Sequence, residues 1–311
     1  MKPLVSVIIP ANNAGSVLSF ALSSVLAQTY PDWEIVLVDD GSRDRTWEVG
    51  NAVTDGRVRR FRLESNHGRG FARQYALERA AGEYVCMLDA DDWMYPWRIE
   101  EQIQVLESCP SLSYVTAGMA IAGRAGSLTG VRGVPLEFAR YSPAGRLRRP
   151  RTPFAPSMFR TAVARAYGFD PSLTVAEDAD FLMRLQREEP FGVLPRILYV
   201  YSEHGSVSLE KLLLSAAAQR RIYAKHWRRE PLAAAAGIVG STVKSAVYCG
   251  IFAFGAAERL VRRRSRRPTA QETAEYRAAY RRVAQLAAKH FSLHIGERDI
   301  GQAAVVAPAG A

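Results

Sequence analysis

Cysteine is scarce in this chain of 311 residues, which carries only Cys86, Cys109 and Cys249. The number is odd and the three positions are far apart, so they form neither a disulfide framework nor a metal-ligand pair. This usage is typical of a reducing compartment. A secretory signal is also lacking, because the apolar run after Lys2 ends at Pro10 and is too short for a signal core. We therefore expect a cytoplasmic protein.

Net charge is nearly absent from residues 1–204, where 23 Lys and Arg face 24 Asp and Glu. Residues 205–311 carry 18 basic against 7 acidic residues, so the formal net charge of +10 belongs to the C-terminal third. Segments of this kind bind acidic membrane surfaces, phosphates or nucleic acid, and a solvated helix face is the alternative. Nucleic acid is the least favoured partner, because few aromatic residues lie among the arginines.

Apolar runs alternate with helical patterns through most of the chain. Runs typical of strands occupy 4–10, 33–40, 58–63, 83–88 and 193–201. Helical patterns occupy 14–28, 42–53, 69–81, 96–108, 160–167 and 178–188. This repetition predicts an α/β fold with a mostly parallel, doubly wound sheet. Ser42 is expected to cap the second helix, residues 121–157 to form a long functional loop rich in Gly, Pro and Arg, and the chain from 208 onward to be helical.

Acidic residues follow two of the predicted strands. Asp39 and Asp40 end one strand, and Asp89, Asp91 and Asp92 follow another. Both ends should face the crevice beyond the carboxyl ends of the strands, where ligands of such sheets bind. Crowded carboxylates repel one another, and a Mg²⁺ or Mn²⁺ ion that also binds substrate phosphates would offset this cost. The alternative is a solvated acidic turn before the next helix.

Four stretches of the sequence, in this order, resemble the family 2 glycosyltransferases, which use nucleotide sugars and have the GT-A fold. They are VSVIIPANN, SVLAQTYPDWEIVLVDDGSRDRT, AAGEYVCMLDADDWMYPWRI and AEDADFLMRL. The resemblance extends over roughly residues 4–204. It implies inverting transfer of a sugar from a nucleotide diphosphate sugar to a hydroxyl acceptor, with Mn²⁺ or Mg²⁺ as cofactor.

The resemblance also implies roles for individual residues. The implied nucleotide-binding residues are Pro10, Asn12, Asp40, Arg73 and Asp91. The implied metal ligands are Asp91, Asp92 and His204, although a lone His such as His204 is commonly structural or exposed. Asn12 stands where the family usually has Tyr or Phe, and ARQ at 72–74 replaces ARN. These departures leave the nucleotide open, with UDP as the default and dTDP and GDP as alternatives.

Glu177 and Asp178 open the predicted helix near residue 178. Inverting transfer needs a base that deprotonates the acceptor hydroxyl as it attacks the anomeric carbon, and a carboxylate within hydrogen-bond reach suffices. By resemblance Asp178 is this base and Glu177 its neighbour on the acceptor side. The alternative is a pair of acidic residues stabilised by the helix dipole.

We expect two units, a GT-A catalytic domain over 1–207 and a helical basic extension over 208–311. Within the extension, residues 232–257 are mostly apolar and an arginine-rich stretch follows at 258–268. Three interpretations stay open: a membrane span, a peripheral contact with an anionic membrane at the inner face of the cell membrane, or helices packed on the domain or on a second subunit.

The leading functional hypothesis is single, non-processive sugar transfer to a glycan or lipid-linked acceptor in the synthesis of cell-surface polysaccharide or glycolipid. The Gln-x-x-Arg-Trp signature of processive synthases is lacking. A nucleotidyltransferase is disfavoured, because PANNAGS after the first strand has no basic residue and a single Gly. A non-catalytic nucleotide-sugar-binding protein is disfavoured by the intact pair Glu177 and Asp178.

Overall fold

The computed structural model describes residues 2–123, 126–203, 208–253 and 265–291. Its strands are β1 Val5–Ala11, β2 Trp33–Asp39, β3 Val58–Arg62, β4 Tyr84–Met87, β5 Trp93–Met94, β6 Tyr114–Ala122, β7 Leu128–Arg132, β8 Ala139–Tyr141, β9 Met158–Arg160 and β10 Phe191–Ser202. Its helices are α1 Leu18–Leu26, α2 Thr46–Ala52, α3 Arg69–Arg79, α4 Arg98–Ser108, α5 Thr161–Tyr167, α6 Glu177–Glu188, α7 Leu209–Lys225, α8 Pro231–Ala253 and α10 Ala270–Phe291.

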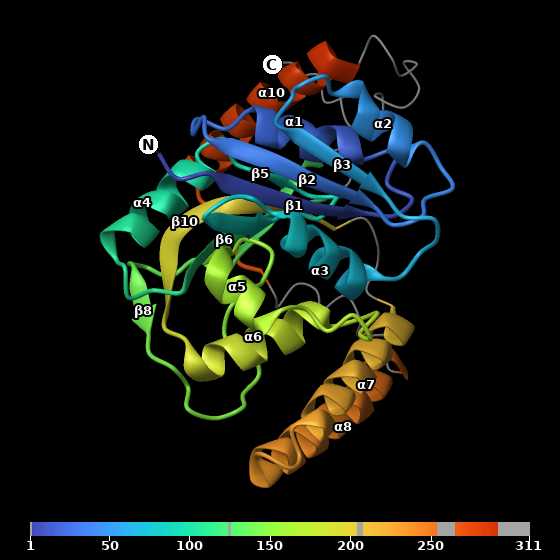
Figure 1. Cartoon of the computed structure of the whole chain (residues 1–311). Coiled ribbons are helices and arrows are strands. Elements are labelled where there is room, and N and C mark those ends of the chain that lie inside the picture. Colours follow the sequence, from blue (N-terminus) through green and yellow to red (C-terminus); the bar gives the residue numbers. More distant parts are fainter. Residues whose placement is uncertain (1, 124–125, 204–207, 254–264, 292–311) are drawn as a thin grey trace.

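The ten strands form one sheet with helices on both faces (Figure 1). Its main path runs β3-β2-β1-β4-β9-β6-β10-β5, while β7 pairs with β6 and β8 with β10. Strands β3, β2, β1 and β4 are parallel neighbours, and the short β9 joins them to β6 by antiparallel pairing on both sides. The carboxyl ends of the four parallel strands therefore meet at one edge, as a doubly wound sheet requires.

Alternate residues of the central strands supply two separate cores. On β1, Val7 and Ile9 pack with α1, α2 and α4, whereas Ile8 faces α3, α5 and α6. Burial on both faces explains why β1, β2 and β4 read as continuous apolar runs in the sequence. The expected α/β architecture is confirmed.

Two local expectations were wrong. Residues 121–157 do not form one long loop, because they contain the end of β6 together with β7 and β8. The short β7 pairs with β6 and the short β8 with β10. Their stability therefore comes from pairing with distant strands, which the local sequence does not indicate. Ser42 does not cap α2, which begins at Thr46; the Ser42 hydroxyl instead accepts a hydrogen bond from the backbone N–H of Asn13 (2.9 Å).

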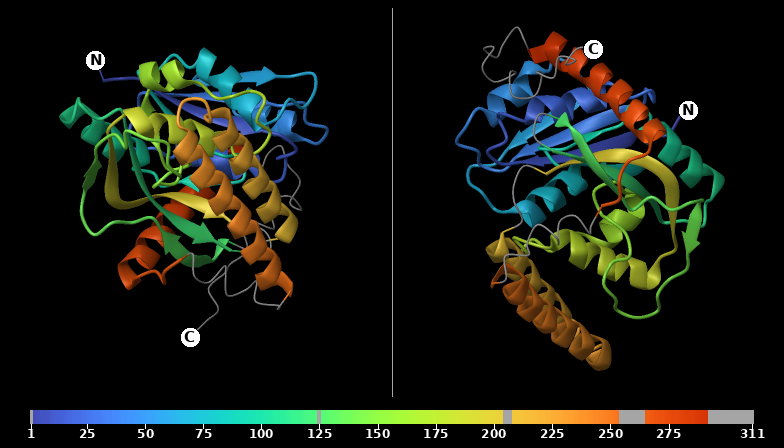
Figure 2. Two further views of the ribbon diagram at one scale, coloured as in Figure 1. Left: turned by 90° about the horizontal axis from the view of Figure 1, so that it is seen from below. Right: turned by 180° about the vertical axis from the view of Figure 1, so that it is seen from behind.

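The C-terminal helices lie in two different places. Helices α7 and α8 pack against each other as a hairpin that projects from the sheet (Figures 1 and 2). Their approach is close at Gly237, where a Cβ atom would lie 2.3 Å from the ring of Tyr223. Helix α10 returns to the sheet, where Tyr276 and Val283 are buried in a cluster with Trp93. The domain division at residue 207 stays a prediction, and α10 packs with the residues assigned to the first unit.

The packing of α10 makes a testable contribution to stability. Tyr276 is 3% exposed, its ring centroid lies 5.4 Å from that of Trp93, and its hydroxyl donates a hydrogen bond to the Gly126 carbonyl (2.8 Å). Tyr276→Ala should lower the free energy of unfolding by about 3–5 kcal/mol, as for other buried aromatic side chains. Arg282→Ala, on the exposed face of the same helix, should change it by less than about 0.5 kcal/mol. Equal denaturation midpoints for the two variants would contradict the packing of α10 as a part of the core.

Candidate active site

A buried acidic anchor lies where β1 and β2 end. Asp40 is 3% exposed, and its carboxylate accepts hydrogen bonds from the backbone N–H groups of His67 (2.8 Å) and Gly68 (2.9 Å). Gly41 has φ +65°, and a Cβ atom there would lie 2.3 Å from the backbone of Ser65, so only glycine allows this approach. Asp40 thus holds the segment just before α3 close to the end of β2.

The other residues expected at the nucleotide lie next to this anchor. Pro10 is in β1, paired with Val38, and the exposed Asn12 donates a hydrogen bond from Nδ2 to the Asp40 carbonyl (2.6 Å). Asn12 Oδ1 also accepts from Asn66 Nδ2 (3.1 Å). The fold therefore brings Pro10, Asn12 and Asp40 together at one edge of the sheet, and their contact with a nucleotide stays a prediction.

Arg73 joins the two acidic motifs. Its guanidinium is buried, donates to Asp89 Oδ1 through Nη2 (2.6 Å) and pairs with Glu177 Oε1 through Nη1. Burial opposes its charge, but Asp89, Glu177 and Asp178 outweigh burial and raise the pKa of Arg73. Burial raises the pKa of Glu177, and Arg73 and Arg69 act against that rise. Residues 104 positions apart in the chain are thereby held in one ion-pair network.

The acidic turn after β4 is held in place by hydrogen bonds from β10. Asp92 is 2% exposed; its Oδ2 accepts from the Tyr199 hydroxyl (2.7 Å) and its Oδ1 from the Ser202 N–H (2.7 Å). Burial raises the pKa of Asp92, and the neighbouring Asp89 and Asp91 add to the rise. Asp91 is exposed, whereas Asp92 faces β10.

A buried arginine supports the same turn. Arg98 is fully buried and donates to the carbonyl oxygens of Met87 (3.1 Å), Ala155 (3.1 Å) and Ser157 (3.0 Å). Met87 is the last residue of β4, so Arg98 ties the start of the acidic turn to the segment before β9. Burial lowers the pKa of Arg98.

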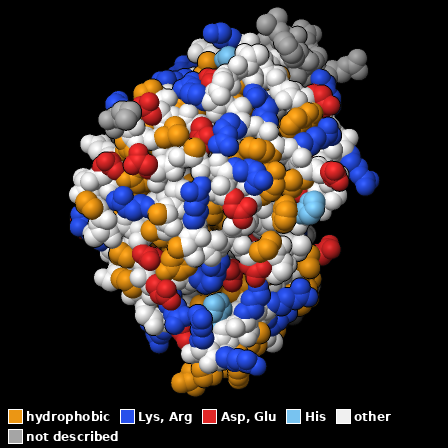
Figure 3. Space-filling model, viewed as in Figure 1, with side chains coloured by type: hydrophobic (Ala, Val, Ile, Leu, Met, Phe, Trp, Pro, Cys, Tyr) orange, Lys and Arg blue, Asp and Glu red, His pale blue; other side chains and the backbone are white. Residues whose placement is uncertain are grey.

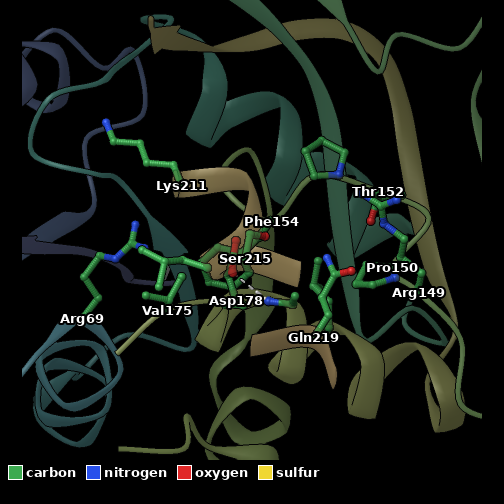
Figure 4. A pocket seen from close by; sticks show the side chains of 15 residues that line it. Arg69, Arg149, Pro150, Thr152, Phe154, Val175, Asp178, Lys211, Ser215 and Gln219 are labelled. Atoms are coloured by element: carbon green, nitrogen blue, oxygen red, sulfur yellow. Dashed lines mark hydrogen bonds between the residues drawn. The ribbon is translucent and has the colours of Figure 1, made fainter. Parts of the chain in front are cut away.

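Helix α6 presents Asp178 to a cavity. Ala176, the residue before the helix, has φ +64°, a left-handed conformation that costs energy for a residue other than glycine. Glu177 is fully buried, while Asp178 is half-buried and lines an open cavity of about 650 Å³. Figure 4 shows Asp178 near the centre of this cavity, with Arg69 and Lys211 on one side and Arg149 on the other.

A divalent cation needs side-chain ligands that lie close together. Within the described ranges, no three His, Cys, Asp or Glu side chains converge as a ready metal site. Asp91 and the exposed part of Asp89 nevertheless offer hard oxygen donors at the carboxyl end of β4, and Mg²⁺ or Mn²⁺ commonly takes one or two carboxylates plus substrate phosphates. The donor chemistry therefore fits such an ion. His204 lies outside the described residues.

Three residues that organise this site were not singled out from the sequence. Tyr199 holds Asp92, Arg98 holds the end of β4, and Arg69 lies 3.6 Å from Glu177 through its Nε atom. Arg69 and Arg73 are four positions apart on α3, a spacing that places both on one helix face and was available as a signal. Tyr199 carried no such signal, because its partner lies 107 positions away.

The comparisons with known proteins agree with this geometry. The model of the family "Glycosyl transferase family 2" matches residues 6–171. The Escherichia coli protein WfaP, named UDP-Glc:alpha-D-GlcNAc-diphosphoundecaprenol beta-1,3-glucosyltransferase, is 37% identical over 105 residues, which are 34% of this chain and 42% of WfaP. The match therefore spans less than half the length of such curated relatives.

Two solved structures share the fold over nearly the whole chain. TarS of S. aureus in complex with UDP-GlcNAc superposes with a TM-score of 0.57 at 22% identity, covering 91% of this chain and 81% of that one. The mannosyltransferase PcManGT of Pyrobaculum calidifontis, in complex with GDP-Man and Mn²⁺, superposes with a TM-score of 0.55 at 18% identity, covering 95% and 89%. With the family model spanning more than half of its length, this chain belongs to glycosyl transferase family 2 and has the GT-A fold.

Proposed function

We propose that this protein is an inverting glycosyltransferase that moves one sugar from a nucleotide diphosphate sugar, with UDP as the expected nucleotide, to a hydroxyl of a cell-surface glycan or lipid-linked precursor. The observation that carries the proposal is the Arg73 network. Because one buried guanidinium binds both Asp89 and Glu177, the acidic turn after β4 and the start of α6 face a common space. A donor diphosphate and an acceptor base are needed side by side in such a reaction.

The donor is proposed to lie along the carboxyl ends of β1, β2 and β4. Asp40, Asn12 and Pro10 would contact the nucleoside. The hydrogen bonds of Asp40 and Asn12 to the backbone keep this crevice in shape before a ligand binds. Arg73 is buried and paired with protein carboxylates, so its proposed part is to position Asp89 and Glu177 beside the donor.

Asp178 is proposed as the general base. It is half-buried, it opens to the cavity, and its Oδ1 accepts a hydrogen bond from the Ala179 N–H (2.8 Å), which orients the carboxylate. Arg69 and Arg149 line the same cavity as Asp178. The buried Glu177 would hold the start of α6 through Arg73.

The proposed metal ligands are Asp91 and Asp92, with His204. Asp91 is exposed, and at Asp92 a metal would have to share the oxygens that Tyr199 and Ser202 now use. A bound Mn²⁺ or Mg²⁺ would neutralise charge on the departing diphosphate.

A membrane contact through α8 is proposed as a further part of the function. Among the helices described, α8 is the one long and apolar enough to cross a membrane by length and composition, and 17% of its most apolar stretch is buried. Leu232, Val239, Val243 and Val247 are exposed on α8 at spacings of seven, four and four, which places them on one face. Of the arginines expected to assist, Arg259, Arg262, Arg263 and Arg264 lie outside the described residues, and Arg266 pairs with Glu272 (2.5 Å).

The base assignment is tested by Asp178→Asn. The variant should bind the nucleotide sugar as before but transfer the sugar about 10²- to 10⁴-fold more slowly, because it cannot accept the acceptor proton. Glu188→Gln, at the exposed far end of α6, serves as the matched control and should keep the activity. Single-turnover rates and donor titrations separate the two effects. Transfer by Asp178→Asn at the unsubstituted rate would remove Asp178 as the base, and no transfer by the unsubstituted protein would favour a non-catalytic binding protein.

The metal requirement is tested with a chelator. Excess chelator should abolish transfer and added Mn²⁺ should restore it, because the donor diphosphate needs a cation among these carboxylates. Asp91→Asn should raise the Mn²⁺ concentration that gives half-maximal activity, whereas Asp55→Asn, near the amino end of β3, should not. Full activity in excess chelator would rule out the metal role.

The membrane contact is tested by co-sedimentation with vesicles that contain anionic lipid. The protein should pellet at low salt and be released as salt rises, because each basic residue near an anionic surface contributes about 1 kcal/mol that salt screens. The triple variant Val239→Asn, Val243→Asn and Val247→Asn should weaken pelleting, while Leu136→Asn, an exposed apolar residue elsewhere, should leave it unchanged. Binding that only detergent reverses would indicate a span, and no binding at low salt would indicate packing alone.

A further inference from the structure

We propose that the cavity beside Asp178 contains a subsite for the diphosphate of an acceptor, with Arg149 and Lys211 as its binding residues. The inference rests on the proposed function and deepens it, because it names the class of acceptor: a sugar carried on a diphosphate. The cavity is lined by α6, α7, the start of α3 and the segment before β9, so its ligand would lie directly against the proposed base (Figure 4).

The first observation is the charge of the cavity wall. Its lining residues include three cations, Arg69, Arg149 and Lys211, and one carboxylate, Asp178. Arg69 lies 3.6 Å from Glu177 and is partly neutralised. No carboxylate of the described residues lies within ion-pair distance of Arg149 or Lys211, and both side chains are exposed. Two cations without an ion-pair partner among the described residues therefore line the cavity, and a diphosphate diester carries two negative charges.

The second observation is the basic segment from which Arg149 comes. Residues 146–151 read RLRRPR, and their four arginines are exposed with no ion-pair partner in the part of the chain that is described. The segment is held in place by the Leu147 N–H, which donates to Glu230 Oε2 (2.7 Å), and by the Arg151 N–H, which donates to Gln186 Oε1 (3.0 Å). These contacts fix the backbone and leave the guanidinium groups available. Guanidinium groups bind phosphate through paired hydrogen bonds, which suits a phosphate-bearing ligand.

The position of the cavity assigns this phosphate to the acceptor. None of the residues at the ends of β1, β2 and β4 lines it, so it is separate from the crevice proposed for the donor diphosphate. Asp178 bounds the cavity, which is where an attacking hydroxyl must lie. A distant relative in the same family, WfaP, is named for an acceptor linked through a diphosphate to a lipid.

The hairpin adds a reason to expect a lipid beyond the diphosphate. Helix α7 supplies Lys211, Leu214, Ser215 and Gln219 to the cavity and packs along α8, whose exposed apolar face is described above. Figure 3 shows hydrophobic side chains gathered at the free end of this hairpin, beside several Lys and Arg side chains. An apolar chain attached to the diphosphate would lie next to this surface.

The test measures binding and transfer for three soluble acceptors. The first is N-acetylglucosamine linked through a diphosphate to an octyl chain, the second is the neutral octyl glycoside of the same sugar, and the third is the diphosphate with a methyl group in place of the octyl chain. Binding is measured by calorimetry on the full chain in the presence of UDP and Mn²⁺, and transfer is measured with the nucleotide sugar that a donor panel selects.

The unsubstituted protein should bind both diphosphate acceptors more tightly than the neutral glycoside. Arg149→Gln and Lys211→Gln should each weaken binding of both diphosphate acceptors about 10-fold or more, the usual effect of losing one hydrogen bond to a charged group. Neither variant should change binding of the neutral glycoside or the KM for the donor. Arg228→Gln, an exposed charge of the same hairpin outside the cavity lining, is the matched control and should change none of these values.

The outcomes separate the subsite from the proposed function. Equal binding of the diphosphate and neutral octyl acceptors, or no binding of the diphosphate acceptors, would overturn the subsite even if sugar transfer occurs. Binding of the octyl but not the methyl diphosphate would overturn it as well, since the chain and not the phosphate would then be recognised. A higher donor KM in Arg149→Gln would move the phosphate contact to the donor. Diphosphate binding that depends on Arg149 but is accompanied by no transfer would support the subsite and contradict the proposed function.

Discussion

The buried guanidinium of Arg73 is the interaction on which the arrangement of the site depends. A charge that is almost wholly removed from water requires charged partners, and Arg73 has two, Asp89 after β4 and Glu177 at the start of α6. Removing one partner of such a buried pair costs about 3–5 kcal/mol, because the other is left uncompensated. Helix α6 therefore cannot shift relative to the end of β4 without a large loss. The same ion pairs fix the position of Glu177, which directly follows the left-handed residue Ala176.

Beside the acidic turn after β4, buried positions that could be apolar are occupied by Asp92 and Arg98. Asp92 is bound to Tyr199 and Ser202 of β10, and Arg98 binds carbonyl groups at the end of β4 and in the segment before β9. Asp92 and Arg98 both have hydrogen-bond partners, so the cost of their burial is offset and the geometry of the turn is specified. Asp91 alone of the pair projects outward. The acidic turn thus contains one carboxylate that holds structure and one that is exposed.

The C-terminal third divides between two tasks. Helix α10 completes the core through Tyr276 and Val283, whereas α7 and α8 pack mainly on each other and α7 forms one wall of the cavity beside Asp178. The apolar face of α8 is unfavourable for an isolated soluble domain, and the clustered arginines of the 146–151 segment repel one another. Both find a use if the acceptor is an anionic molecule attached to a lipid, which unites the proposed membrane contact with the proposed subsite.

The sequence by itself determined the parallel half of the sheet, because buried strands must be continuous apolar runs and β1, β2 and β4 are such runs. It also placed Asp40 and Asp89 at the same edge of the sheet, since the carboxyl ends of parallel strands share an edge. Only the tertiary structure decided that β9 joins the two halves, that Asp92 turns toward Tyr199, and that α10 leaves α7 and α8. Each of these depends on contacts between residues far apart in the chain, which leave no periodic pattern in the local sequence.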